Sequence, residues 1–133
     1  MLLLAAVWDG DGPIWCAEGP KIRLHGIAAR EVRRSGGRTV DGGCRPGHPC
    51  PRTAGPVARD RLVALLGGAK GQLPTGHVKV HGPVLSCVSY GSAKGSRTDA
   101  SCAAPAVGDL SCALVRAGVA VRWRTYGGEG VCR

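Results

Sequence analysis

The chain has 133 residues, enough for one domain with a modest core, and we expect a single domain over 1–133. It contains no Phe, three Trp and two Tyr, which excludes an aromatic core and leaves Val, Leu, Ile and Ala to fill it. Its net charge of +9 favours a polyanionic partner, and nucleic acid ranks ahead of a membrane because no basic amphipathic helix is present.

The first quarter of the chain is typical of three short strands joined by tight turns. The expected strands are residues 2–8, 13–17 and 21–27. In the third, Ile22 and Leu24 alternate with Arg23 and His25, which predicts one buried face and one polar face. We expect His25 to be simply exposed, the alternative being a phosphate contact or a base. The apolar start, 1–7, is too short for a signal peptide or a membrane span.

The middle of the chain divides into a predicted loop and a predicted helix. Residues 28–52 are rich in Arg, Gly and Pro, which favours a surface loop. Residues 53–66 are expected to be helical, with Thr53 as the cap, Pro56 in the first turn and Gly67 at the end.

The second half is predicted to return to strands before a last helix. The expected strands are 75–81, 84–90 and 97–103, followed by a helix from 108 or 109 to 117 and a flexible tail over 127–133. This order predicts an α+β fold, mainly β. We expect an OB-type five-stranded barrel with two or three short helices.

Seven Cys in so short a chain indicate an oxidising compartment, so we expect a secreted or periplasmic protein. Cys44 and Cys50 favour a local disulfide over a zinc site that would include His48. Cys87 and Cys102 lie on strands expected to form a hairpin. Cys16, Cys112 and Cys132 compete for the third bridge; Cys112–Cys132 is favoured, leaving Cys16 free, although spacing alone does not fix the pairing.

Three pieces of the sequence, taken in order, resemble the thermonuclease (staphylococcal-nuclease-like) family. They are Asp-Gly-Asp at 9–11, Arg-Leu-His-Gly-Ile at 23–27 with a glutamate at 31, and Leu-Val-Arg-Ala-Gly-Val-Ala at 114–120. The resemblance covers nearly the whole chain. It implies an OB-type fold and hydrolysis of phosphodiester bonds in DNA or RNA with little base preference.

The resemblance also implies roles for individual residues. Arg23 matches the first family arginine, which holds phosphate through paired hydrogen bonds. Glu31 matches the glutamate that accepts a proton from the attacking water or orients it. The second arginine is assigned to Arg97, because Tyr90-Gly91 is followed by Ser92 and an insertion displaces the arginine of the family motif.

The calcium site implied by the resemblance is altered in this sequence. Asp9 and Asp11 match the aspartates of the family turn, and Asp11 matches a direct ligand. Ala28 stands where a second ligand aspartate is expected, and Arg30 adds positive charge nearby. Calcium prefers six to eight oxygens, so we expect a weak or absent site.

Aromatic side chains could add base stacking to phosphate binding. Tyr90 and Tyr126 are the candidates for contact with nucleotides, together with Lys94, whereas Trp8 and Trp15 are expected in the core. No Cys has the His and carboxylate neighbours that a catalytic thiol needs.

Three functions follow as hypotheses. The first is a calcium-dependent endonuclease that acts as a monomer. The second is an oligonucleotide-binding module with little or no turnover, favoured by Ala28. The third is a disulfide-stabilised secreted domain that binds proteins.

Overall fold

The fold is mainly β, with a mixed sheet and few helices. The computed structural model describes residues 2–132, and side chains are described for 6–132. The strands are β1 (Leu2–Asp9), β2 (Gly12–Cys16), β3 (Lys21–Leu24), β4 (Ile27–Ala28), β5 (Glu31–Ser35), β6 (Arg38–Gly43), β7 (Ala69–Gln72), β8 (Val78–Val80), β9 (Val84–Ala93), β10 (Arg97–Ala104), β11 (Gly108–Asp109) and β12 (Val121–Arg122). The helices are α1 (Gly55–Leu65) and α2 (Leu110–Arg116), followed by short 3₁₀ turns at Arg124–Tyr126 and Gly128–Gly130.

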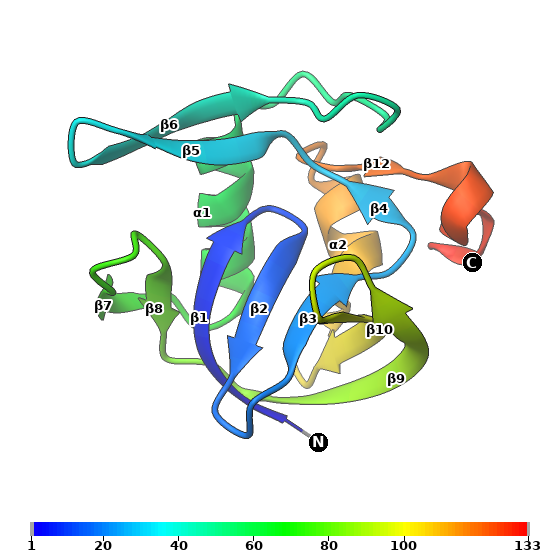
Figure 1. The fold of residues 1–133 in the computed structure, drawn as a ribbon. Coiled ribbons are helices and arrows are strands. Elements are labelled where there is room, and N and C mark those ends of the chain that lie inside the picture. Colours follow the sequence, from blue (N-terminus) through cyan, green and yellow to red (C-terminus); the bar gives the residue numbers. More distant parts are fainter. Residues whose placement is uncertain (1, 133) are drawn as a thin grey trace.

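The main sheet joins strands from the first and the second half of the chain. Its strand order is β11-β10-β3-β2-β1-β8-β7, and β3 and β10 are parallel. The long strand β9 pairs with β10 along its length and with the start of β1. Two small sheets, β5–β6 and β4–β12, lie outside it. In Figure 1, α1 and α2 lie behind β1, β2 and β3, and the β5–β6 hairpin crosses the top.

Alternation along the strands sorts the core from the surface. In β2 the buried Ile14 is flanked by half-buried Pro13 and Trp15, and in β3 the buried Ile22 is flanked by Lys21 and Arg23. The aliphatic side chains meet the buried faces of the helices, which include Leu62, Leu66, Leu110 and Leu114. A core of aliphatic residues was the expectation from composition.

Trp8 and Trp15 are not in the core, contrary to the expectation from sequence. Both are half-buried on the outer face of the sheet, because they alternate with the inward-facing Val7, Asp9, Ile14 and Cys16. The aliphatic side chains fill the interior without them.

The predicted loop over 28–52 is wrong in its first half, where β5 and β6 form an antiparallel hairpin. Gly36 and Gly37 both have positive φ at its turn, a conformation that glycine adopts readily. Two consecutive glycines are a recognised hairpin signal, here hidden among arginines. Strand β7 was also missed, and the third predicted strand ends at Leu24 before a turn leads into β4.

The two helices lie where they were predicted, with differences at the caps. Pro56 occupies the first turn of α1, but Ala54 is its N-cap and the Thr53 hydroxyl instead donates to the carbonyl of Gly118 at 3.0 Å. Val57, next to Pro56 in α1, is 57 % exposed. In α2 the carboxylate of Asp109 caps the helix by accepting from the Cys112 amide at 2.8 Å.

Three disulfides join the pairs favoured from the sequence: Cys44–Cys50, Cys87–Cys102 and Cys112–Cys132. Cys16 is a buried free thiol, and burial together with the nearby Glu18 raises its pKa to about 11. The last bridge ties the C-terminal segment to α2. Intramolecular disulfides are compatible with an extracellular or periplasmic location. None of the helices over 2–132 is long and apolar enough to cross a membrane.

Candidate nucleic-acid interface

The parallel pairing of β3 and β10 brings the two predicted arginines to one place. Arg23 pairs with Asp99 in this register. Arg97 precedes Asp99 by two residues and therefore lies on the same outer face of β10. The two guanidinium groups thus come from strands far apart in sequence but adjacent in the sheet.

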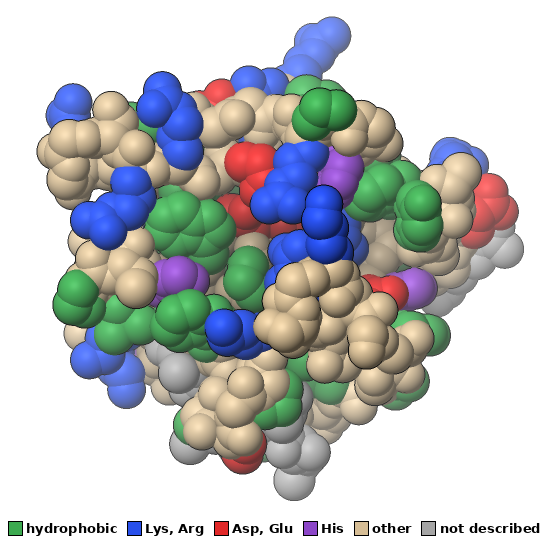
Figure 2. Space-filling view, viewed as in Figure 1, with side chains coloured by type: hydrophobic (Ala, Val, Ile, Leu, Met, Phe, Trp, Pro, Cys, Tyr) green, Lys and Arg blue, Asp and Glu red, His purple; other side chains and the backbone are tan. Residues whose placement is uncertain are grey.

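Both arginines line one pocket of about 520 Å³, which we call the Arg23–Arg97 pocket. Its charged lining residues are Arg23, Arg45, Lys94, Arg97 and Asp99, and its rings are His48, Trp123 and Tyr126. Four cations therefore face one carboxylate. Figure 2 shows Lys and Arg side chains gathered near the middle of this face, next to Asp and Glu side chains.

Arg23 is held firmly before any ligand binds. Its guanidinium donates to the carbonyls of Leu24 at 3.2 Å and Ile27 at 3.0 Å, and lies 3.8 Å from a carboxylate oxygen of Asp11. The guanidinium carbon lies 5.3 Å from the ring centroid of Trp123, a cation–π distance. The side chain is 15 % exposed, so its position is fixed while part of the group stays accessible from the pocket.

Lys94 lies in the turn between β9 and β10, and Arg97 is the first residue of β10. The Nε of Arg97 donates to the carbonyl of Lys94 at 2.7 Å, and no acidic partner of Arg97 is found over 2–132. The resemblance implies an insertion after Tyr90-Gly91, and this turn lies where that insertion is expected. It places Lys94 and Arg97 at the same pocket.

Aromatic rings form the other side of the pocket. Trp123 lies 4.2 Å from the His48 ring and 4.7 Å from the Tyr126 ring, between centroids. Burial and the charge of Arg23 lower the pKa of His48, which favours the neutral imidazole. Tyr126, a predicted contact residue, is 63 % exposed at the pocket.

Tyr90 does not line this pocket, whereas Tyr126 does. It stacks on His25 at 3.9 Å and lines a second cavity of about 570 Å³ beside α2. The Nδ1 of His25 lies 2.9 Å from a carboxylate oxygen of Asp99. His25 is therefore a paired and half-buried residue rather than the exposed histidine expected from sequence.

The three predicted carboxylates lie together beside the pocket, and we call them the carboxylate corner: Asp9, Asp11 and Glu31. Asp9 is 3 % exposed and accepts from the amide of Asp11 at 3.3 Å. Burial, with Asp11 and Glu31 nearby, raises the pKa of Asp9 well above its ordinary value. Asp11 accepts from the Ala29 amide at 3.3 Å.

Glu31 is engaged by an arginine that sequence reasoning missed. The Nε of Arg45 lies 2.7 Å from a carboxylate oxygen of Glu31. Arg45 also lines the Arg23–Arg97 pocket, so it connects the predicted base to the predicted phosphate site. Arg45 belongs to the loop closed by the Cys44–Cys50 disulfide, whose course was not readable from sequence.

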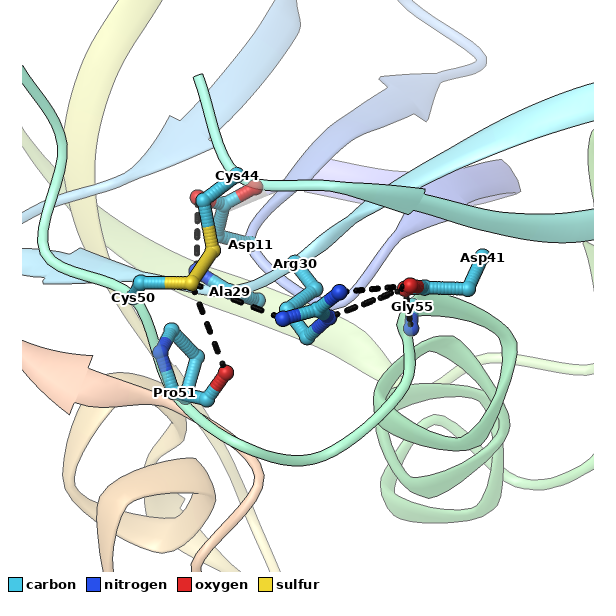
Figure 3. The surroundings of a disulfide bond; sticks show 8 residues. All are labelled: Asp11, Ala29, Arg30, Asp41, Cys44, Cys50, Pro51 and Gly55. Atoms are coloured by element: carbon cyan, nitrogen blue, oxygen red, sulfur yellow. Dashed lines mark hydrogen bonds and ion pairs between the residues drawn. A yellow bond between two sulfur atoms is a disulfide. The ribbon is translucent and has the colours of Figure 1, made fainter. Parts of the chain in front are cut away.

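Arg30 does not add its charge to the carboxylate corner as expected. It forms a two-pronged ion pair with Asp41, with an Nη2–Oδ2 distance of 2.7 Å, and Asp41 also accepts from the Gly55 amide at 2.9 Å (Figure 3). These donors hold the pKa of Asp41 well below its usual range. Arg30 therefore links the hairpin to the start of α1.

The donor groups do not fit the calcium site implied by the resemblance. Ala28 is buried and carries no carboxylate, and Glu31 is already paired with Arg45. Asp11 lies 3.8 Å from the guanidinium of Arg23, which competes with a metal ion for this carboxylate. Within 2–132, no group of three or more His, Cys, Asp and Glu side chains is placed to hold a metal ion.

Neither a protein-family model, nor a curated protein, nor a solved structure matches the chain.

Proposed function

We propose that this protein is a thermonuclease-like phosphodiesterase that binds single strands of DNA or RNA and holds one phosphate between Arg23 and Arg97. The observation that carries the proposal is the shared pocket of these two arginines, with Lys94 and Arg45 on the same lining. Guanidinium groups match phosphate oxygens in charge and in geometry. The four cations exceed the single carboxylate of Asp99, so the pocket favours an anion.

The strand pairings support an OB-type barrel as the scaffold. Five strands pair in the order β1-β2-β3-β10-β9, and β9 also pairs with the start of β1. OB-type barrels bind oligonucleotides across an exposed sheet face. The rings of Trp123 and Tyr126 beside the cations suit bases of any sequence.

In the proposed reaction, the oxygen of a water molecule attacks the phosphorus atom while Glu31 accepts a proton from that water. The bond between phosphorus and the leaving oxygen of the next sugar breaks, and that oxygen takes up a proton from solvent. Arg23 and Arg97 stabilise the negative charge that grows on the phosphoryl oxygens. Glu31 must exchange its contact with Arg45 for the water, and phosphate oxygens offer Arg45 a replacement partner.

The proposal assigns no step to calcium, because the carboxylates are already engaged. Calcium binding at Asp9 and Asp11 stays a prediction from the resemblance. Secretion or periplasmic location and a monomeric state likewise stay predictions.

The second candidate function is an oligonucleotide-binding module without turnover. The pairing of Glu31 with Arg45 at 2.7 Å favours it, because a paired carboxylate is a poorer base. The missing carboxylate at Ala28 favours it too. This candidate uses the same pocket and predicts strongly salt-dependent binding.

The test is incubation of the purified, disulfide-bonded protein with labelled single-stranded DNA and RNA, with calcium or with chelator, followed by gel analysis. We expect cleavage by the wild type and none by Glu31→Gln. Binding is measured in parallel by fluorescence anisotropy over a salt series.

The two readouts separate the candidates. Binding by wild type and Glu31→Gln alike, with cleavage by neither, would leave the binding module and remove the enzyme. Absence of binding at low salt would remove both and return the chain to the third hypothesis, a domain that binds proteins.

A further inference from the structure

A row of outward-facing side chains crosses three strands next to the Arg23–Arg97 pocket. Trp15 on β2 pairs with Lys21 on β3, and the Lys21 Nζ lies 5.2 Å from the Trp15 ring centroid. Lys21 precedes Ile22, which pairs with Thr98, and Arg97 is the neighbour of Thr98 on β10. The pleat therefore directs Trp15, Lys21 and Arg97 to the same outer face.

This row lines a groove of about 380 Å³ with two further rings, Trp8 and His77. The ring of His77 lies 3.9 Å from Trp15 and 5.0 Å from Trp8, between centroids. The Thr75 hydroxyl lies 2.7 Å from Nδ1 of His77 and fixes the imidazole. Burial and Lys21 lower the pKa of His77, so the ring favours its neutral form. Figure 2 shows hydrophobic side chains and a His side chain to the left of the Lys and Arg side chains that gather near the middle of the view.

Arg97 lines both the groove and the Arg23–Arg97 pocket. The two hollows therefore share one lining residue, Arg97. The groove has cations at Lys21 and Arg97, and none of its lining residues is Asp or Glu. An occupant with a flat ring and a flanking negative charge matches this lining.

We propose that the groove is a second subsite, in which Trp15 and His77 stack on a nucleobase of a strand whose phosphate is held by Arg23 and Arg97. One nucleotide has its base on Trp15 and His77, and the next has its phosphate in the Arg23–Arg97 pocket. Lys21 and Arg97 neutralise the phosphate that joins these two nucleotides. Stacking of this kind accepts any base, because every base has a flat face. The proposal rests on the proposed function, and it sets the minimum ligand at more than one nucleotide.

The experiment compares two single strands of equal length, about eight nucleotides, one of thymidines and one abasic over its whole length. Each is labelled at one end, and the base-containing strand is made in deoxy and ribo forms. Anisotropy at low salt gives the affinity of the wild type, Trp15→Ala, Trp15→Phe and His77→Ala. Circular dichroism and thermal unfolding establish that each variant is folded.

We expect the wild type to bind the base-containing strand in preference to the abasic strand. Trp15→Ala should reduce its affinity for the base-containing strand about tenfold. Its affinity for the abasic strand should not change, and Trp15→Phe should restore most of the loss. If Trp15→Ala does not fold, His77→Ala carries the same comparison, because His77 lies in a loop before β8.

An unchanged preference in both Trp15→Ala and His77→Ala would overturn the second subsite and leave the phosphate site standing. Failure of the wild type to bind either strand would instead overturn the proposed function, and the subsite with it.

Discussion

The Arg23–Arg97 pocket and the carboxylate corner are neighbours of opposite charge, and they differ in how their charges are satisfied. In the pocket, the Nε of Arg97 donates to the carbonyl of Lys94, no acidic partner of Arg97 is found over 2–132, and the cations are in excess. In the corner, Glu31 is paired with Arg45, and the pKa of Asp9 is raised. The comparison shows that cations of the pocket remain accessible, whereas the carboxylates of the corner are largely engaged within the protein.

The largest effect should come from removing a cation of the pocket. Arg23→Gln is expected to weaken oligonucleotide binding by about 1.5–3 kcal/mol, the range for hydrogen bonds to charged groups. Anisotropy at several salt concentrations measures the loss, and the slope of affinity against salt should also become shallower. Arg61→Gln is the matched control, because Arg61 is exposed on α1. Equal losses in the two variants would mean that only net charge matters.

A smaller effect of opposite sign is expected at the corner. Glu31→Gln should tighten oligonucleotide binding, because it removes a negative charge and frees Arg45 for phosphate. The gain should be about 0.2–1 kcal/mol, the usual range for a partly exposed ion pair. Asp60→Asn on α1 serves as the control for loss of one acidic charge. Weaker binding by Glu31→Gln would contradict this account of Arg45.

The protonation of Asp9 should appear in the pH dependence of stability. Because its pKa is raised on folding, the native state binds more protons than the unfolded state above the unfolded value near 3.8. Stability from this group is therefore complete below that pH and falls as pH rises through the native pKa. Asp9→Asn should remove this decline, as urea unfolding at several pH values would reveal. If Asp9→Asn had the same pH profile of stability as the wild type, the raised pKa of Asp9 would be contradicted.

Asp41 should behave in the opposite way and with the smallest effect. Its pKa is lowered by Arg30 and by the Gly55 amide, so its contribution is present above the unfolded value and lost as pH falls. Asp41→Asn should be slightly less stable than wild type at neutral pH, and the gap should close in acid. Solvent screening of this exposed pair keeps the effect small. The same unfolding series detects it, and a gap that widens in acid would argue against the ion pair.

Much of the scaffold was predictable because its signals are local. Alternation marked β3, an apolar run marked β1, and Pro56 and Gly67 bounded α1. The β5–β6 hairpin was missed because arginine and glycine hid a short alternating pattern. Trp8 and Trp15 were misplaced because composition says that aromatic rings are scarce but does not say which face of a strand they occupy.

The site was predictable only in part, for a related reason. Motif order pointed to Arg23 and Glu31, and the insertion after Gly91 pointed to Arg97; their roles in catalysis stay predictions. No local signal marks Arg45, His48 or Trp123, because a disulfide-closed loop and the segment after α2 carry them to the pocket. Arg30 pairs with Asp41 and not with the carboxylate corner, because the β5–β6 hairpin, which the sequence did not predict, carries Asp41 to it.

The parallel pairing of β3 with β10 also dictates when the pocket can exist. His25 and Asp99, which lie beside it, are 74 residues apart in the chain. A nascent or proteolysed chain that stops short of β10 keeps Lys21 and Arg23 but has no Arg97 to oppose them. The proposed phosphate site would therefore form only after synthesis of β10, and the Cys87–Cys102 bridge would hold β9 and β10 together after a cut in the turn between them.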